Sequence, residues 1–138
     1  MVDSEDSIQR RLVELLGNYC RPDVAWFAVP NGGWRFKRTA AKLKATGVRP
    51  GVPDIVILVR GRFHGVELKR ENGRTSKAQD GMAVEIERAG GGYHVCRGFR
   101  EALLCLIELG VFQPRIRFTV SGEAIANAKS QSVSVPVL

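Results

Sequence analysis

An uninterrupted apolar run at residues 55–59, rich in β-branched side chains, constrains the fold of this chain most strongly. Such a run predicts a strand that is buried on both faces of a sheet, and we expect this strand to span Asp54–Arg60. A second strand is predicted over Phe63–Lys69. Gly61 and Arg62 lie between the two runs, and we expect them to form a two-residue turn, in which glycine tolerates positive φ. The centre of the chain is therefore predicted to be a β-hairpin.

The predicted turn decides which side chains share a face of this hairpin. It places Asp54 opposite Lys69 and Val56 opposite Glu67, and residues two apart on one strand point to the same side. Asp54, Glu67 and Lys69 are therefore expected on one face, at one end of the hairpin. The other face is expected to be core and to pair Ile55 with Leu68, Ile57 with Val66 and Val59 with His64.

Two carboxylates in such a cluster need positive charge beside them. At a separation of about 6 Å they repel by roughly 3 kcal/mol at an effective dielectric constant near 20. Taken alone, Asp54, Glu67 and Lys69 favour a cross-strand salt bridge. A hard divalent cation offsets the repulsion better, since Mg²⁺ and Mn²⁺ prefer oxygen ligands. A lysine beside such an ion can position a water or help deprotonate it, which begins phosphodiester hydrolysis. The surrounding sequence favours this second interpretation.

Three segments carry a specific resemblance: Gly51–Asp54, Val66–Lys69 and Gly73–Gln79. Together they resemble the PD-(D/E)xK nuclease superfamily and, within it, the virus-type replication-repair nuclease (VRR-NUC) family. The resemblance extends from about Ser4 to Leu109. It implies an α/β fold with a restriction-endonuclease-like core, a mixed β-sheet flanked by helices in the order α-β-β-β-α-β-α. We expect a single nuclease domain over residues 1–118, followed by a tail, 119–138, that is disordered or docks as a strand at a partner's edge.

The resemblance also implies an activity. A protein of this family is expected to be a Mg²⁺- or Mn²⁺-dependent, structure-specific endonuclease that cleaves Holliday junctions or other branched DNA in repair, recombination or replication. It is expected to be a homodimer without an organic cofactor, cytoplasmic, and encoded by a bacterium or a phage. The implied roles are metal ligation by Asp54, Glu67 and the Leu68 backbone carbonyl, catalysis by Lys69, an accessory role for Gln79, and a helix-borne acid at Glu5.

Two of these residues have an equally good structural explanation. Glu5 lies in the first turn of a predicted helix, where a carboxylate complements the helix dipole by a few tenths of a kcal/mol. Gln79 ends the sequence Ser76-Lys-Ala-Gln, a capping box in which the Gln side chain bonds the backbone of the cap residue. Both interpretations stay open for both residues.

Positive charge is concentrated between Pro30 and Pro53. This segment holds six basic residues and no acidic one, while the rest of the chain has 15 basic and 14 acidic residues. Next to the predicted site, such a segment favours contact with nucleic acid phosphates, and its aromatic residues could stack on bases. The predicted contacts are Asn31, Trp34, Arg35, Lys37, Arg38, Lys42, Lys44 and Arg49. The alternatives are a solvated loop, with turn chemistry explaining Asn31, a non-catalytic DNA-binding or scaffolding module, and an RNA substrate.

The remaining pattern predicts the other elements. These are a helix capped by Asp3 or Ser4 that ends near Tyr19, a strand over Val24–Val29, a short helix over Thr39–Thr46, a helix opened by Ser76, a strand over Tyr93–Arg97 and a helix over Phe99–Leu109. The last strand is reached through a helix and is expected to run parallel to its neighbour.

Cysteines, histidines and hydropathy exclude several other classes of protein. Cys20, Cys96 and Cys105 lack Cys-x-x-Cys spacing, so we expect reduced core thiols rather than a disulfide framework or a zinc site. His64 and His94 stand alone in strand-like runs and are expected in the core or at a sheet edge. The acidic N-terminus is unlike a secretory signal, and no apolar segment is long enough for a membrane span.

Overall fold

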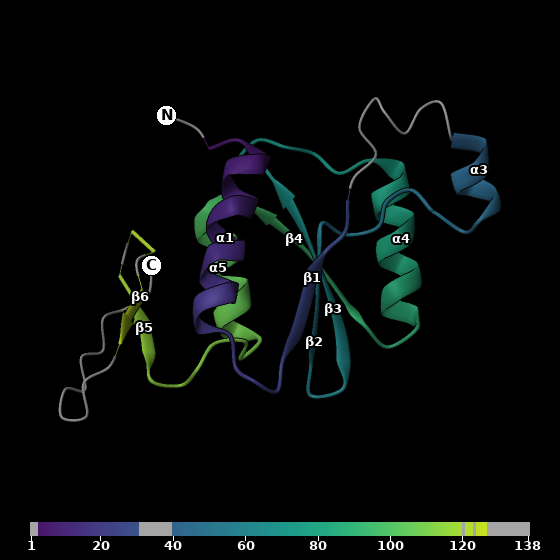
Figure 1. Ribbon diagram of the computed structural model, residues 1–138. Helices are drawn as coiled ribbons and strands as arrows, with labels where there is room; N and C mark the ends of the chain where they lie inside the picture. Colours follow the sequence, from purple (N-terminus) through teal and green to yellow (C-terminus); the bar gives the residue numbers. More distant parts are fainter. Residues whose placement is uncertain (1–2, 31–39, 120, 123, 127–138) are drawn as a thin grey trace.

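A four-stranded mixed sheet lies between helices on its two faces in the computed structural model, which describes residues 3–30, 40–119, 121–122 and 124–126 (Figure 1). The strands are β1 (Ala25–Ala28), β2 (Ile55–Val59), β3 (Arg62–Lys69) and β4 (Gly92–Arg97), in that spatial order. β1, β2 and β3 are successively antiparallel, whereas β4 runs parallel to β3. The predicted mixed sheet is confirmed.

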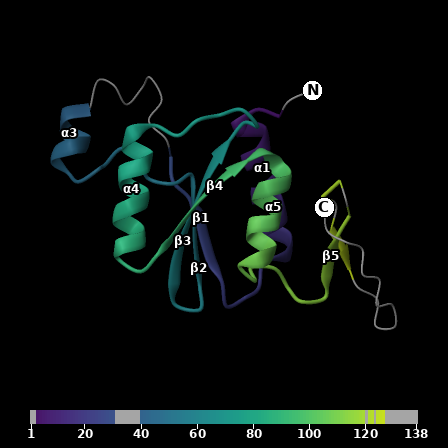
Figure 2. The same ribbon diagram turned by 180° about the vertical axis from the view of Figure 1, so that it is seen from behind.

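Helices cover both faces of this sheet, as predicted. Figures 1 and 2 show α1 (Glu5–Tyr19) and α5 (Gly98–Glu108) on one face, α4 (Lys77–Arg88) on the other, and the short α3 (Ala40–Ala45) beyond α4. The first helix begins where the Ser4 side chain accepts the backbone N–H of Ser7 at 3.0 Å. Its buried residues recur at helical spacing and pack against the sheet: Ile8, Leu12 and Leu16. None of the described helices could cross a membrane.

The hairpin turn consists of Arg60 and Gly61, so the prediction of Gly61 and Arg62 is wrong. Arg60 and Gly61 have φ angles of 51° and 71°, and a type I′ turn requires positive φ at both central positions. Pro53 supports this register because it packs against Gly65, where any Cβ would overlap the proline ring. Only glycine therefore fits at position 65.

The register is shifted by two residues from the prediction, and the shift changes partners without changing faces. The observed pairs are Ile55 with Val66, Val56 with Gly65, Ile57 with His64 and Val59 with Arg62. An even shift leaves each side chain on its predicted side because the side-chain period of a strand is two. Continuing the ladder by one residue brings Asp54 level with Glu67 rather than with Lys69. The three charged residues still share one face.

A second, two-stranded sheet follows α5. It pairs β5 (Ile116–Phe118) with β6 (Ala124–Ala126) in antiparallel orientation, and the sequence predicted neither strand. Phe118 joins the main core, and Gly122 approaches Phe99 of α5 so closely that a Cβ there would overlap its ring. Part of the segment predicted as a tail thus pairs within the chain, while residues 127–138 lie outside the described residues.

Candidate functional site

Two carboxylates are buried together where β2 begins and β3 ends. Asp54 is 6 % exposed and Glu67 is 3 % exposed. The backbone N–H of Leu68 donates to Asp54 Oδ2 at 2.7 Å, which ties the start of β2 to the end of β3. Burial of two acidic groups at one point is costly unless hydrogen bonds or positive charge compensate it. The local sequence therefore maintains an arrangement that packing alone disfavours.

Lys69 and Gln79 supply the polar contacts of Glu67. Lys69 Nζ lies 3.6 Å from Glu67 Oε2, and Gln79 Nε2 donates to the same oxygen at 3.0 Å. Gln79 also completes the capping box of α4, since its Oε1 accepts the backbone N–H of Ser76 at 2.9 Å. One Gln79 side chain thus makes both contacts, with the start of α4 and with the Glu67 carboxylate, and its accessory role in the site stays a prediction.

The electrostatics of this pair leave Glu67 short of positive charge. The pKa of Glu67 is raised to about 8. Burial is the largest cause, Asp54 acts in the same direction, and Lys69 opposes the shift. Glu5, the exposed first residue of α1, adds a smaller repulsion in the same direction. The role of Glu5 as an acid of the site stays a prediction.

Tyr93 belongs to this site and was not predicted. It pairs with Gly65 across the parallel ladder, so it lies on the same face as Glu67, and its hydroxyl donates to the Gly51 carbonyl at 3.1 Å. Burial and the two carboxylates raise the pKa of Tyr93. The alternation of residues along β4 was the available signal, but it becomes useful only once the neighbouring strand is known.

Gly51 fixes the loop that leads into Asp54. Its φ is +85°, and a Cβ at this position would overlap the backbone carbonyl of Ala78 in the first turn of α4. Together with the Tyr93 hydrogen bond, this contact holds the segment before Asp54 between α4 and β4. The Gly-Val-Pro-Asp sequence is therefore a packing unit that positions the carboxylate.

Only part of the predicted nucleic-acid surface lies within the described residues. Lys42 and Lys44 are exposed on α3. Arg49 instead forms an exposed, bidentate ion pair with Glu85 of α4, in which Arg49 Nη1 lies 2.8 Å from Glu85 Oε1. The other predicted contacts lie outside the described residues: Asn31, Trp34, Arg35, Lys37 and Arg38.

The donor set at this site suits a hard divalent cation. Across the part of the chain that the structure describes, no group of three or more His, Cys, Asp or Glu residues is arranged to hold a metal ion. Mg²⁺ does not require such a cage, because it is commonly held by one or two carboxylates and keeps waters or phosphate oxygens elsewhere. Asp54 and Glu67 supply two buried carboxylates, and the positive charge of Lys69 does not fully offset them. Two such oxygen ligands fit a hard divalent ion.

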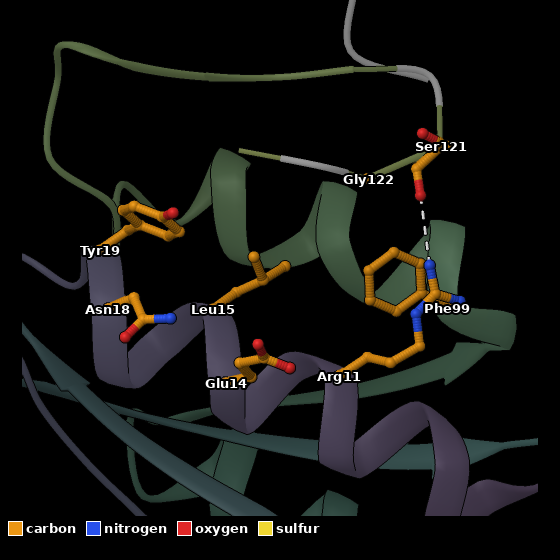
Figure 3. Close-up of a pocket in the computed structure, with 8 residues that line it drawn as sticks. All are labelled: Arg11, Glu14, Leu15, Asn18, Tyr19, Phe99, Ser121 and Gly122. Atoms are coloured by element: carbon orange, nitrogen blue, oxygen red, sulfur yellow. Dashed lines mark hydrogen bonds between the residues drawn. The ribbon is translucent and has the colours of Figure 1, made fainter. Parts of the chain in front are cut away.

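A separate pocket lies on the opposite side of the molecule from α4. Figure 3 shows it between α1, α5 and the segment that precedes β6. Arg11 stacks over the Phe99 ring at 3.6 Å and donates to the Ser121 carbonyl at 3.2 Å. It is lined by Arg11, Glu14, Leu15, Asn18, Tyr19, Phe99, Ser121 and Gly122, and it contains none of the predicted site residues.

Comparison with known proteins identifies a matching family and two similar folds. The family model described as "VRR-NUC domain" matches residues 4–100. A solved structure of a "VRR_NUC domain protein" is 20 % identical with a TM-score of 0.65 and covers 80 % of this chain and 97 % of its own. A second, described as a "VRR_NUC domain", is 21 % identical with a TM-score of 0.53 and covers 75 % and 94 %. No curated protein matches.

Proposed function

This chain belongs to the VRR-NUC domain family, a family of nucleases, and we propose that it is a Mg²⁺- or Mn²⁺-dependent endonuclease acting on branched DNA. One observation carries the proposal, namely the burial of Asp54 and Glu67 side by side with Lys69 at 3.6 Å from Glu67. A structural salt bridge needs one carboxylate for one ammonium. A divalent cation bound to both carboxylates would offset the repulsion between them, which one lysine does not remove.

Each site residue has a separate task in this mechanism. Asp54 and Glu67 would hold the divalent ion through their carboxylate oxygens, and the Leu68 carbonyl would be a further ligand. The ion, when bound, supplies a Lewis acid that stabilises charge on the phosphoryl oxygens and acidifies the attacking water. Lys69 orients that water and stabilises the developing negative charge. Gln79 fixes the side chain of Glu67 through its 3.0 Å hydrogen bond.

The form of the substrate follows from two further features. Exposed Lys42 and Lys44 on α3 provide phosphate contacts that do not depend on base sequence. Phe27 of β1 and Leu58 of β2 are 51 % and 40 % exposed, share one face, and lie next to the open edge of the sheet. We propose that a second copy of the chain covers this apolar surface. A two-fold dimer places two sites against the two strands that a junction presents for cutting.

A cleavage assay on matched substrates tests the activity. Fluorescent four-way junction, flap and linear duplex DNA are incubated with the protein in Mg²⁺, in Mn²⁺ and in EDTA. We expect cleavage of the branched substrates that stops in EDTA, and a single species of twice the chain mass in light scattering. Equal DNA binding with and without EDTA, and no cleavage with either metal, would establish a binding module instead.

Variants separate catalysis from folding in the same assay. Asp54→Asn keeps an acceptor for the Leu68 N–H but removes the charge, and we expect it to abolish cleavage while junction binding stays within about twofold. Asp23→Asn is the matched control, since Asp23 is exposed and lies at the opposite end of the sheet. Retained Mg²⁺-dependent cleavage by Asp54→Asn would refute the assignment.

A further inference from the structure

Two thiols and two imidazoles meet at the open edge of the main sheet, away from the carboxylates. β4 is the edge strand, and His94 and Cys96 are two residues apart on the face that packs against α5. α5 brings Cys105 to the same place, and a pocket is lined there by His94, Val95, Cys96, Glu101, Leu104, Cys105 and Glu108. Cys96 is buried, whereas Cys105 and His94 are partly exposed. Solvent-borne reagents can therefore reach Cys105 first.

The imidazoles form a chain that ends at Cys105. His64 Nδ1 and His94 Nε2 are 3.0 Å apart, and their rings are stacked with centroids 5.2 Å apart. If His64 Nδ1 donates to His94 Nε2, then neutral His94 carries its own proton on Nδ1, the nitrogen that is not bonded to His64. Contact with the imidazole of His94 lowers the pKa of Cys105. One ring nitrogen of His94 therefore remains available to donate an N–H to the Cys105 sulfur.

The second thiol acts in the same direction. The neighbouring Cys96 thiol lowers the pKa of Cys105, as His94 does, while burial and Glu108 oppose the shift. Glu101 lines the same pocket as Cys96 and carries a negative charge beside it. The other charged groups around this cluster are Arg62 and Glu87, which act on His94. One thiolate beside one thiol is the arrangement that attacks an oxidant and then resolves the product.

We propose that Cys105 is a modification site for hydroperoxides, and that Cys96 converts its oxidised form into a Cys96–Cys105 disulfide. This thiol pair joins α5 to β4 and lies outside the nuclease site. It gives the nuclease fold a second, oxidant-sensitive chemistry that does not depend on whether the chain cleaves DNA.

Both steps balance with a hydroperoxide as the only oxidant. The Cys105 sulfur attacks the peroxide, so an S–O bond forms and the O–O bond breaks, and the leaving oxygen takes a proton to give water or an alcohol. The Cys96 sulfur then attacks Cys105, so an S–S bond forms and the S–O bond breaks. The departing hydroxide takes the proton of Cys96 and leaves as water. Two electrons pass from the two thiols to the peroxide.

Alkylation of the wild-type protein by iodoacetamide, mapped by mass spectrometry, tests the thiolate. The informative quantity is the pH dependence, because a low-pKa thiolate is also a weaker nucleophile and its absolute rate need not be high. Between pH 6 and pH 8 we expect the rate at Cys105 to change less than about twofold, while an ordinary thiol accelerates about 80-fold. Cys20 is the internal control, since it is also partly buried and its pKa is raised. Parallel profiles for Cys105 and Cys20 would overturn the proposal.

Stoichiometric hydrogen peroxide tests the second step. We expect a peptide pair linking Cys96 to Cys105, reversed by dithiothreitol, in wild type and in Cys20→Ser. Cys96→Ser should instead accumulate a sulfenic acid on Cys105 that dimedone traps. His94→Leu leaves no N–H donor at this position, so it should make the alkylation rate at Cys105 rise with pH. Circular dichroism of each variant confirms folding. Oxidation at Cys20 with Cys105 unchanged, or an absence of the 96–105 link in wild type, would refute the pair.

Discussion

Replacing Glu67 by Gln should stabilise the metal-free protein at neutral and alkaline pH, although the side chain removed is a central residue of the site. The pKa of Glu67 rises from 4.5 to about 8 because the carboxylate is buried beside Asp54. A group with a raised pKa in the fold binds its proton more tightly there than in the unfolded chain. The resulting stabilisation is complete below pH 4.5 and is lost as pH rises to 8.

The size of this effect follows from the same two values. Each pH unit between them lowers the free energy of unfolding by about 1.4 kcal/mol, and the whole interval corresponds to about 5 kcal/mol at most. Gln at position 67 keeps an oxygen that can accept the Gln79 hydrogen bond but never ionises. The Glu67→Gln variant should therefore match wild type near pH 5 and exceed its stability by up to about 4 kcal/mol at pH 8.

Urea unfolding in EDTA at pH 5, 6, 7 and 8 measures the difference. Other titrating groups are shared by the two proteins, so their contributions cancel in the comparison. Glu85→Gln is the matched control, because Glu85 is exposed and its pKa is lowered by Arg49, which leaves no change across this pH range. Parallel stability curves for wild type and Glu67→Gln from pH 5 to 8 would show that the carboxylate is not under the electrostatic strain described here.

Three further outcomes follow from contacts at the site. Glu85→Gln should release Arg49 for phosphate contacts and tighten duplex binding several-fold in a low-salt gel shift, whereas unchanged binding would show that Arg49 does not face DNA. Gly51→Ala should lower the free energy of unfolding, measured in urea, by about 2 kcal/mol or more, because the new Cβ would overlap the backbone of Ala78 and the residue has a positive φ. A loss below about 0.5 kcal/mol would contradict this. Tyr93→Phe should cost about 1 kcal/mol in the same assay by removing one partly buried hydrogen bond, and no change would show that the bond to Gly51 is unimportant.

The sequence alone could predict which face of the sheet carries the site residues, because side chains alternate between the two faces along a strand. A register shift by an even number of residues leaves Asp54, Glu67 and Lys69 on the same face of the sheet. The turn itself could not be predicted, since it places Arg60 in the positive-φ region that glycine ordinarily occupies. The packing of Pro53 against Gly65 supports that choice, and this contact is not visible in either residue's neighbours along the chain.

Features that depend on distant segments were beyond the sequence. Tyr93 joins the site only because β4 runs parallel to β3 in one particular register. The ion pair of Arg49 with Glu85 links residues 36 positions apart, so a basic residue predicted to contact nucleic acid has an internal partner. β6 has only three residues, too few for a period to emerge above its surroundings.

Gln79 bonds both the Ser76 backbone and the Glu67 carboxylate, so few other residues can replace it. Glutamate would retain an acceptor for the Ser76 N–H but would place a third negative charge against Glu67, and asparagine would be one methylene too short to serve both partners. Lysine would neutralise Glu67 yet leave the helix start without its reciprocal bond. A saturation library at this codon, sorted for folding and cleavage together, should return the parental amide and little else.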